Sequence, residues 1–146
     1  MDRAALDVAI DLHIQCGGFC PKGRKSEDGI IPARYPLTET ATEEYSERTE
    51  LNVKWADATL VLVDQQPDKG TVLTIELCKA HNKALMQTDF SGTVNDTQIV
   101  QWILKNKIKI LNIAGSRESS SPGIYGKAYQ LLRKVIIGIH KSNQRM

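Results

Sequence analysis

The chain of 146 residues has no apolar run near the ~20 residues that a membrane-spanning helix requires. Its first segment carries acids at Asp2, Asp7 and Asp11 where a secretory leader would be basic. Together these absences predict a cytoplasmic protein without a membrane partner. Aromatic residues make up only 5% of the chain, too few for the alternating basic and stacking side chains of a nucleic-acid-binding surface. We therefore expect no nucleic-acid partner.

Cysteine is also scarce, and the three cysteines are an odd number in a chain too long to need disulfides for stability. The sequence thus predicts free thiols. Cys16 and Cys20 form a C-x3-C pair, but no second pair of ligands stands at zinc-binding spacing, so no metal site is predicted. Cys20 is either a buried, inert thiol or, beside Lys22, a thiol of lowered pKa. The first alternative is the commoner.

Acidic residues are missing after Glu118, although the formal net charge is only +2. Residues 1–78 contain eight Lys or Arg and fourteen Asp or Glu, and residues 79–146 contain eleven and three, so the halves carry −6 and +8. The basic half could face an anionic ligand or an acidic subunit surface. A solvated helix face explains it equally simply, and we favour that reading.

Strands and helices alternate along the chain. Apolar runs predict buried strands at Ala58–Asp64 and Lys109–Ala114, with a shorter strand at Ala84–Thr88 and a weaker one at Ile14–Phe19, which contains two glycines. Periodicity and capping signals predict helices at Asp2–Ile14, Thr40–Trp55, Gly70–Asn82, Val94–Lys105 and Pro122–Ile139. This order predicts one α/β domain over 1–146, a Rossmann-like three-layer sandwich with a mainly parallel sheet and helices on both faces.

Three loops fall at the sheet edge where such folds bind ligands. The glycines of Gly17–Arg24 leave backbone amides accessible beside several cations, an arrangement that can bind phosphate. The alternative is an ordinary tight turn whose cations are solvated. In Asp64–Glu76, capping explains Thr71 but not Gly70, which favours a ligand contact there. In Ala114–Tyr125, the sequence Gly115-Ser116-Arg117 supplies amides, a hydroxyl and a guanidinium suited to an oxyanion.

No catalytic set assembles from these loops. The three histidines, His13, His81 and His140, all lie outside them. Glu76 and Glu118 could act as a carboxylate pair, but nothing in the sequence fixes the distance between them. Catalysis is therefore not required by the sequence.

With these loops in place, the chain resembles the molybdenum carrier (molybdenum cofactor carrier-like) family. The stretches that carry the resemblance are DRAALDVAIDL (2–12), CGGFCPKGR (16–24), EDGIIPARYPLTET (27–40), RTELNV (48–53), DATLVLVD (57–64), GTVLTIELCKAHNKAL (70–85) and LNIAGSRESSSPGIY (111–125). The family is related to the Rossmann-like lysine-decarboxylase-like (LOG) superfamily. The resemblance implies binding of molybdenum cofactor, a pterin phosphate carrying molybdate, or of a nucleotide-like ligand.

The resemblance also adds Arg48 and Asn52 to the candidate site. The chain departs from it in two places. LOG hydrolases carry a glutamate three residues after Gly-Thr, whereas Glu76 follows Thr71 by five, so hydrolase activity does not carry over. The family pattern also begins with a strand and a Gly-Gly-Gln-Thr-Gly loop ahead of Asp2. We expect the reading frame to extend upstream, with Met1 at the family's valine position. If the strand ahead of Asp2 is absent, we expect self-association to cover the exposed sheet edge.

The sequence thus predicts a carrier of molybdenum cofactor (molybdopterin) or a related phosphate-bearing ligand. It is expected to be homo-oligomeric and to serve molybdoenzymes as partners. The alternatives are a LOG-like phosphoribohydrolase acting on nucleotides and a nucleotide-sensing module without turnover. The residues predicted to bind the cofactor are Asp2, Arg3, Gly18, Lys22, Gly23, Arg24, Arg48, Asn52, Gly70, Thr71, Glu76, Gly115, Ser116, Arg117, Glu118 and Ser119.

Overall fold

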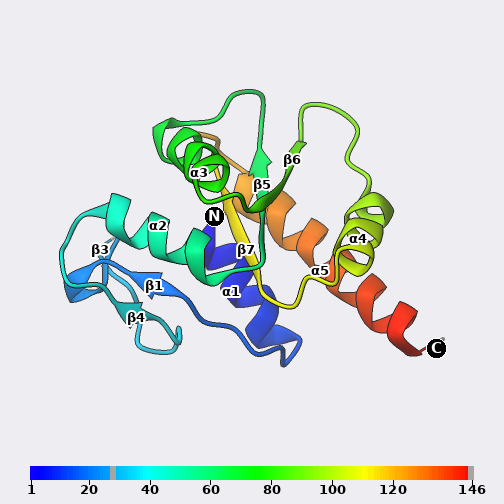
Figure 1. The fold of residues 1–146 in the computed structure, drawn as a ribbon, viewed down its shortest axis with the longest axis horizontal. Coiled ribbons are helices and arrows are strands. Elements are labelled where there is room, and N and C mark those ends of the chain that lie inside the picture. The colour runs from blue at the N-terminus through cyan, green and yellow to red at the C-terminus, as the bar shows by residue number, and fades with distance from the viewer. Residues whose placement is uncertain (27–28, 145–146) are drawn as a thin grey trace.

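The computed structural model describes residues 1–26 and 29–144 and has a three-stranded parallel sheet at its centre (Figure 1). The strand order is β6-β5-β7, with β5 (Ala58–Val63) between β6 (Ala84–Asp89) and β7 (Leu111–Gly115). All six residues of β5 are buried, because helices cover the sheet on both faces and the strand has neighbours on both edges. The predicted α/β fold, with its three strongest strands, is confirmed.

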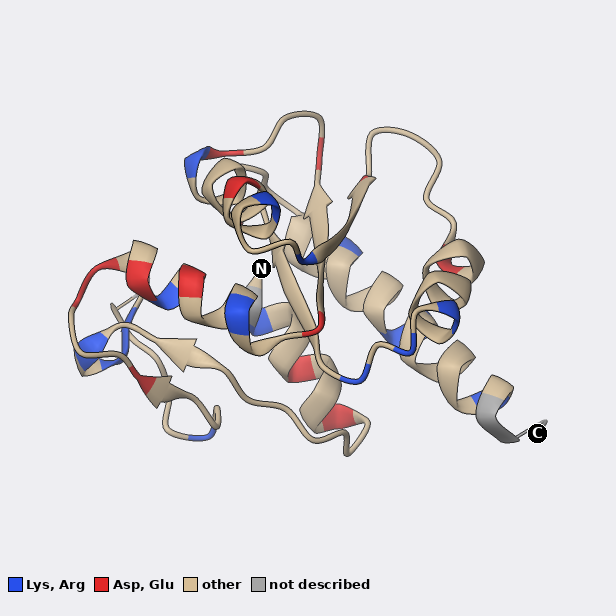
Figure 2. Ribbon diagram, viewed as in Figure 1, with Lys and Arg blue, Asp and Glu red and all other residues tan. Residues whose placement is uncertain are grey.

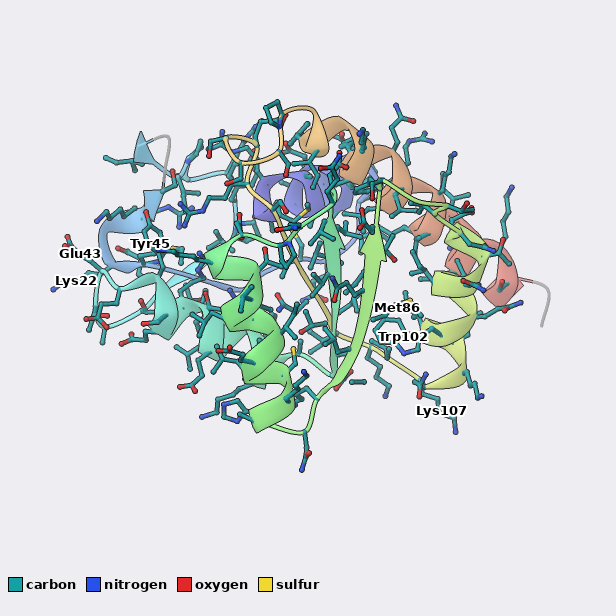
Figure 3. The ribbon with its side chains drawn as sticks, turned by 90° about the horizontal axis from the view of Figure 1, so that it is seen from above. Lys22, Glu43, Tyr45, Met86, Trp102 and Lys107 are labelled. Atoms are coloured by element: carbon teal, nitrogen blue, oxygen red, sulfur yellow. The ribbon has the colours of Figure 1, made fainter. Side chains whose placement is uncertain are left out.

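Two groups of helices form the outer layers. One contains α1 (Asp2–Asp11), α4 (Asp96–Lys105) and α5 (Ile124–Gln144), which pack with Leu60 and Leu62 of β5 into the main apolar core. The other contains α2 (Tyr45–Trp55) and α3 (Lys69–Ala80), which contact each other. Side chains alternate along a strand, so Thr59, Val61 and Val63 face away from the side of Leu60 and Leu62. Met86 of β6 and Trp102 of α4, both labelled in Figure 3, pack against this core.

The segment between α1 and α2 forms a separate small lobe. It contains β1 (Phe19–Cys20) paired in parallel with β4 (Thr38–Glu39), a short 3₁₀ helix (Lys22–Arg24), and β2 (Lys25–Ser26) antiparallel to β3 (Gly29–Ile30). The predicted fourth strand, Ile14–Phe19, was therefore wrong: residues 14–18 form no strand, and β1 pairs outside the central sheet. Gly18, at φ +140°, has a backbone conformation that other residues rarely adopt.

The start of α2 also differs from the prediction. The helix predicted to begin at Thr40 begins instead at Tyr45. The side chain that reaches back is Glu47, whose Oε1 accepts hydrogen bonds from the amides of Ala41 and Thr42 at 2.8 and 3.4 Å. The other helices begin and end within a few residues of their predicted bounds, except that α5 continues to Gln144.

Two acids of α1, Asp7 and Asp11, bind tyrosines of α5 and of the lobe. Asp7 accepts hydrogen bonds from the hydroxyls of Tyr35 (2.6 Å) and Tyr125 (2.5 Å), and Asp11 accepts one from Tyr129. The charge asymmetry of the sequence is also visible in space, since basic residues follow α4, the loop after it and α5, whereas α2 carries several acids (Figure 2). Within the described part of the chain, no helix is long and apolar enough to span a membrane.

Candidate functional site

A cavity of about 780 Å³ lies where the small lobe, α1, α2 and α3 meet the carboxyl end of β7. It is within the usual size range of small-molecule sites, ~300–1,000 Å³. Its walls come from five parts of the chain: Met1, Arg3 and Leu6; Phe19, Cys20, Pro21, Lys25, Ser26, Ile31, Tyr35 and Leu37; Tyr45, Arg48, Thr49 and Asn52; Asp68, Gly70, Thr71 and Thr74; and Asn112 to Gly115 with Arg117, Glu118, Ser119 and Tyr125. The predicted ligand-binding edge of the sheet thus contains a cavity of suitable size.

The described residues around the cavity carry more positive than negative charge. Four of them are cationic (Arg3, Lys25, Arg48 and Arg117) and two are acidic (Asp68 and Glu118). Both acids hold backbone amides: Asp68 accepts from Thr71 and Arg117, and the two oxygens of Glu118 accept from Gly123 at 3.0 and 2.7 Å. The cavity therefore favours an anionic ligand.

The amino end of α3 is capped by Asp68. Its Oδ1 accepts from the amide of Thr71 at 3.0 Å and from the Thr71 hydroxyl at 2.7 Å, and its Oδ2 accepts from the amide of Arg117 at 3.1 Å. Burial alone would raise the pKa of Asp68, but these hydrogen bonds outweigh it and hold the pKa below the ordinary value. The capping role that the sequence assigned to Thr71 therefore belongs to Asp68, and Thr71, which is 2% exposed, supplies the amide and the hydroxyl that Asp68 binds.

Gly70 beside it has no such explanation within the protein. A Cβ at this position would meet only Asp68 Oδ1, at an ordinary contact distance of 3.8 Å. The glycine lines the cavity, in the first turn of a helix, where glycine costs ~0.5–1 kcal/mol relative to alanine. The predicted explanation for glycine at this position, a ligand that approaches its backbone closely, stays a prediction.

The end of β7 is fixed against β5. A Cβ on Gly115 would lie 2.0 Å from the carbonyl oxygen of Leu62, so only glycine fits between the two strands. The amide of Ser116 donates to the same carbonyl at 3.2 Å, and Ser116 is fully buried. These contacts carry the chain out of the sheet so that Arg117, Glu118 and Ser119 reach the cavity wall.

The glycine loop of residues 17–24 is used mainly to build the lobe. The Arg24 guanidinium donates to the carbonyls of Ile31 (3.0 Å), Pro32 (2.9 Å), Tyr35 (2.8 Å) and Leu37 (3.2 Å). The amide of Gly23 donates to Glu39 Oε1 at 2.6 Å. Lys22 is exposed, and its amide donates to Thr42. Of the two readings of this loop, the structure favours the structural turn.

An aromatic wall closes the side of the cavity next to α1. Tyr35 and Tyr125 both line it, and both hydroxyls donate to Asp7. Burial, together with the hydrogen bond to the Asp7 carboxylate, raises the pKa of each tyrosine above its ordinary value. Both hydroxyls are therefore held protonated, and the rings form the wall of the cavity.

The structure places the predicted site residues in two groups. Those that line the cavity are Arg3, Arg48, Asn52, Gly70, Thr71, Gly115, Arg117, Glu118 and Ser119. Those that lie outside its lining are Gly18, Lys22, Gly23, Arg24, Glu76 and Ser116. The side chain of Asp2 lies outside the described part of the structure. Ligand binding by the first group stays a prediction.

Sequence reasoning did not find several residues that line the cavity, namely Tyr35, Tyr45, Asp68, Asn112 and Tyr125. Asp68 had a signal, because an aspartate three residues before Thr71 is a common helix cap. The tyrosines had none, since their partners lie on distant segments of the chain.

The cysteines are free thiols, as predicted. Cys20 lines the cavity but is only 2% exposed. Burial raises the pKa of its thiol, and the nearby positive charges of Arg24 and Arg48 offset only part of that effect. The buried, inert alternative therefore holds. Among residues 1–26 and 29–144, no group of three or more His, Cys, Asp or Glu side chains is placed to hold a metal ion.

Comparison with known proteins agrees with this geometry. No curated protein matches the sequence at a significant level. A crystal structure described as "Putative molybdenum carrier protein", from Syntrophus aciditrophicus SB at 1.45 Å resolution, is 37% identical, with a TM-score of 0.85 over 92% of this chain and 87% of that one. Residues 1–136 also match the circularly permutated YpsA SLOG family. The predicted resemblance is confirmed, and the chain belongs to this family, as a molybdenum-carrier-like SLOG protein.

Proposed function

We propose that this protein binds and carries a small, anionic, phosphate-bearing cofactor, and that this cofactor is molybdenum cofactor. The observation that carries the proposal is the cavity at the end of β7, in which Lys25, Arg48 and Arg117 surround one aromatic ring. The printed description of the 37% identical structure supports the carrier role.

The lining of the cavity offers two kinds of chemistry. Cations suit a phosphate, whereas Met1, Leu6, Leu37 and the rings of Tyr35 and Tyr125 suit a flat heterocycle. A pterin phosphate combines both groups, so the residues present fit molybdenum cofactor. When bound, the cofactor would supply its molybdenum, and the protein's part would be to hold the pterin and the phosphate.

The test is anaerobic purification followed by elemental analysis for molybdenum and by fluorescence of the oxidised pterin. We expect both signals in the native protein at similar molar amounts. Arg3→Glu reverses a charge on the cavity wall and should reduce both signals, whereas Lys134→Glu, an exposed position on α5 outside the cavity, should leave them unchanged. Absence of both signals, together with no binding of added pterin phosphate, would rule out the carrier role.

A nucleotide hydrolase using Glu76 is less well supported, because Glu76 is exposed and lies outside the cavity lining. Glu118 does line the cavity and remains the better candidate base for such an enzyme. Release of base or phosphate from nucleoside monophosphates, lost in Glu118→Gln, would favour the enzyme over the carrier. Nucleotide binding without turnover would favour the sensing module. The cytoplasmic location, the homo-oligomeric state and molybdoenzyme partners stay predictions.

A further inference from the structure

Tyr45, the first residue of α2, lies within 6 Å of three cationic side chains, which come from three separate segments. Lys25 Nζ from β2 lies 5.8 Å from the centre of its ring, Arg48 Cζ from α2 lies 5.7 Å away, and Arg117 Cζ from the loop after β7 lies 5.4 Å away. All four residues line the cavity. Figure 3 shows Tyr45 at the lobe end of α2.

Three positive charges around one ring repel one another. The electron-rich face of a tyrosine attracts a cation, but only weakly at an exposed site, and Lys25 and Arg117 are exposed. An anion shared by the three groups would convert the repulsion into attraction. The cluster thus has the charge distribution of an anion-binding subsite.

The two other anion sites that the sequence suggested are filled by groups of the protein itself. The Asp68 carboxylate takes the Thr71 amide at the amino end of α3. In the glycine loop, Glu39 accepts a hydrogen bond from the Gly23 amide, and four backbone carbonyls accept hydrogen bonds from the Arg24 guanidinium. An incoming phosphate would have to displace these contacts at either site. The three cations around Tyr45 all line the cavity.

We propose that Lys25, Arg48 and Arg117 form the subsite for a terminal phosphate monoester of the ligand, and that the ring of Tyr45 positions the three cations. This assignment rests on the proposed function and adds Lys25 and Tyr45 to the site. A monoester matches the cluster better than a diester, because it carries up to two negative charges and three unbridged oxygens. Two guanidinium groups can each bind a pair of such oxygens.

The test compares 6-hydroxymethylpterin monophosphate with unphosphorylated 6-hydroxymethylpterin by isothermal titration calorimetry. The ratio of their two affinities, here called the phosphate ratio, isolates the phosphate. Arg48→Gln and Arg117→Gln should each lower this ratio by about 10- to 100-fold. Lys25→Gln, at an exposed position, should lower it by about three- to tenfold. Lys134→Gln is the control: it removes an exposed cation on α5, outside the cavity lining, and should leave the ratio unchanged.

The positioning role of Tyr45 has its own pair of variants. Tyr45→Phe keeps the ring and should keep the phosphate ratio, whereas Tyr45→Leu removes the ring and should lower it. Circular dichroism spectra check that each variant is folded. If Tyr45→Leu does not fold, the ratios of the Lys25 and arginine variants still decide the subsite.

The charge of the phosphate gives a third readout. The second pKa of a phosphate monoester is about 6, so the phosphate ratio should rise between pH 5 and pH 7.5 as the dianion forms. A ratio that is flat over this range would contradict a dianion subsite. If both probes bind but the cluster variants leave the ratio unchanged, the subsite is wrong and the proposed function stands. If neither probe binds the native protein, both fail.

Discussion

The hydroxyl of Tyr125 on α5 donates a 2.5 Å hydrogen bond to Asp7 on α1, and the hydroxyl of Tyr35 in the lobe donates to the other oxygen of the same carboxylate. One acidic side chain thus joins the first helix, the last helix and the lobe beside the cavity. Because the pKa of each of these two tyrosines is raised above its ordinary value, the folded state prefers both hydroxyls protonated.

This predicts a loss of stability at alkaline pH. Below the ordinary tyrosine pKa of about 10, both hydroxyls are protonated in the folded and in the unfolded state, so their hydrogen bonds to Asp7 contribute fully to the free energy of unfolding. Above it the unfolded chain releases its protons first, so the free energy of unfolding falls as pH rises toward the folded pKa values. Urea unfolding between pH 8.5 and 11 should show this decline, and the double variant Tyr35→Phe/Tyr125→Phe should show a shallower one. Equal slopes would mean that Asp7 does not couple to these hydroxyls.

Gly115→Ala should strongly destabilise the fold. The added Cβ would overlap the carbonyl oxygen of Leu62 at 2.0 Å, and neither strand can move without breaking the β5–β7 ladder. We expect a cost of at least about 2–3 kcal/mol in the free energy of unfolding. Gly126→Ala is the control, because a Cβ there meets nothing within 4 Å and α5 should gain ~0.5–1 kcal/mol. Two variants of equal stability would contradict the close approach.

Asp68→Ala should destabilise more than loss of an ordinary helix cap. Asp68 accepts from the amide and hydroxyl of Thr71 and from the amide of Arg117, whereas Asn95 at the start of α4 caps a single amide, that of Gln98. We expect ~1–2 kcal/mol for Asp68→Ala and less for Asn95→Ala by urea unfolding. Since the folded pKa of Asp68 is lowered, this contribution is complete above the ordinary aspartate pKa and is lost as pH falls below it. A difference that persists undiminished at pH 2 would refute the assignment to the ionised carboxylate.

Arg24→Lys should loosen the lobe even though it keeps the charge. A lysine cannot reproduce the fork that donates to four carbonyls, so amide hydrogen exchange in residues 29–39 should become faster. Overall stability should fall by ~1–3 kcal/mol. Lys22→Ala, at an exposed neighbouring position, should stay within ~0.5 kcal/mol of the native protein. If Arg24→Lys instead weakened ligand binding without changing exchange, Arg24 would be a ligand contact, as the sequence suggested.

The sequence predicted the parts of this fold that depend on local pattern. The continuous apolar run of Ala58–Val63 indicated a strand covered on both faces, and the structure has it at the centre of the sheet. The weak strand predicted at Ile14–Phe19 is wrong, because glycine allows a backbone conformation that strand propensity does not specify, and Gly18 adopts it.

The candidate site was predictable only where it follows the sheet. Gly115 ends β7 and Arg117 follows two residues later, so their place at the functional edge could be deduced from the predicted strand. Tyr45, by contrast, meets Lys25 and Arg117 from segments 20 and 72 residues away, and no periodicity marks such a meeting. Arg24 resembled a phosphate ligand in sequence because a guanidinium suits carbonyls and phosphates equally well.

The link between α1 and α5 also constrains how the protein is made. The ribosome releases α1 long before it has synthesised β7 and α5, the elements with which α1 packs. The apolar face of α1, with Ala4 and Val8, therefore lacks its packing partners until β7 and α5 have been synthesised. Docking of the last helix should complete the cavity and the core in one late, cooperative step. A nascent chain stalled before α5 should consequently be protease-sensitive along its entire first half.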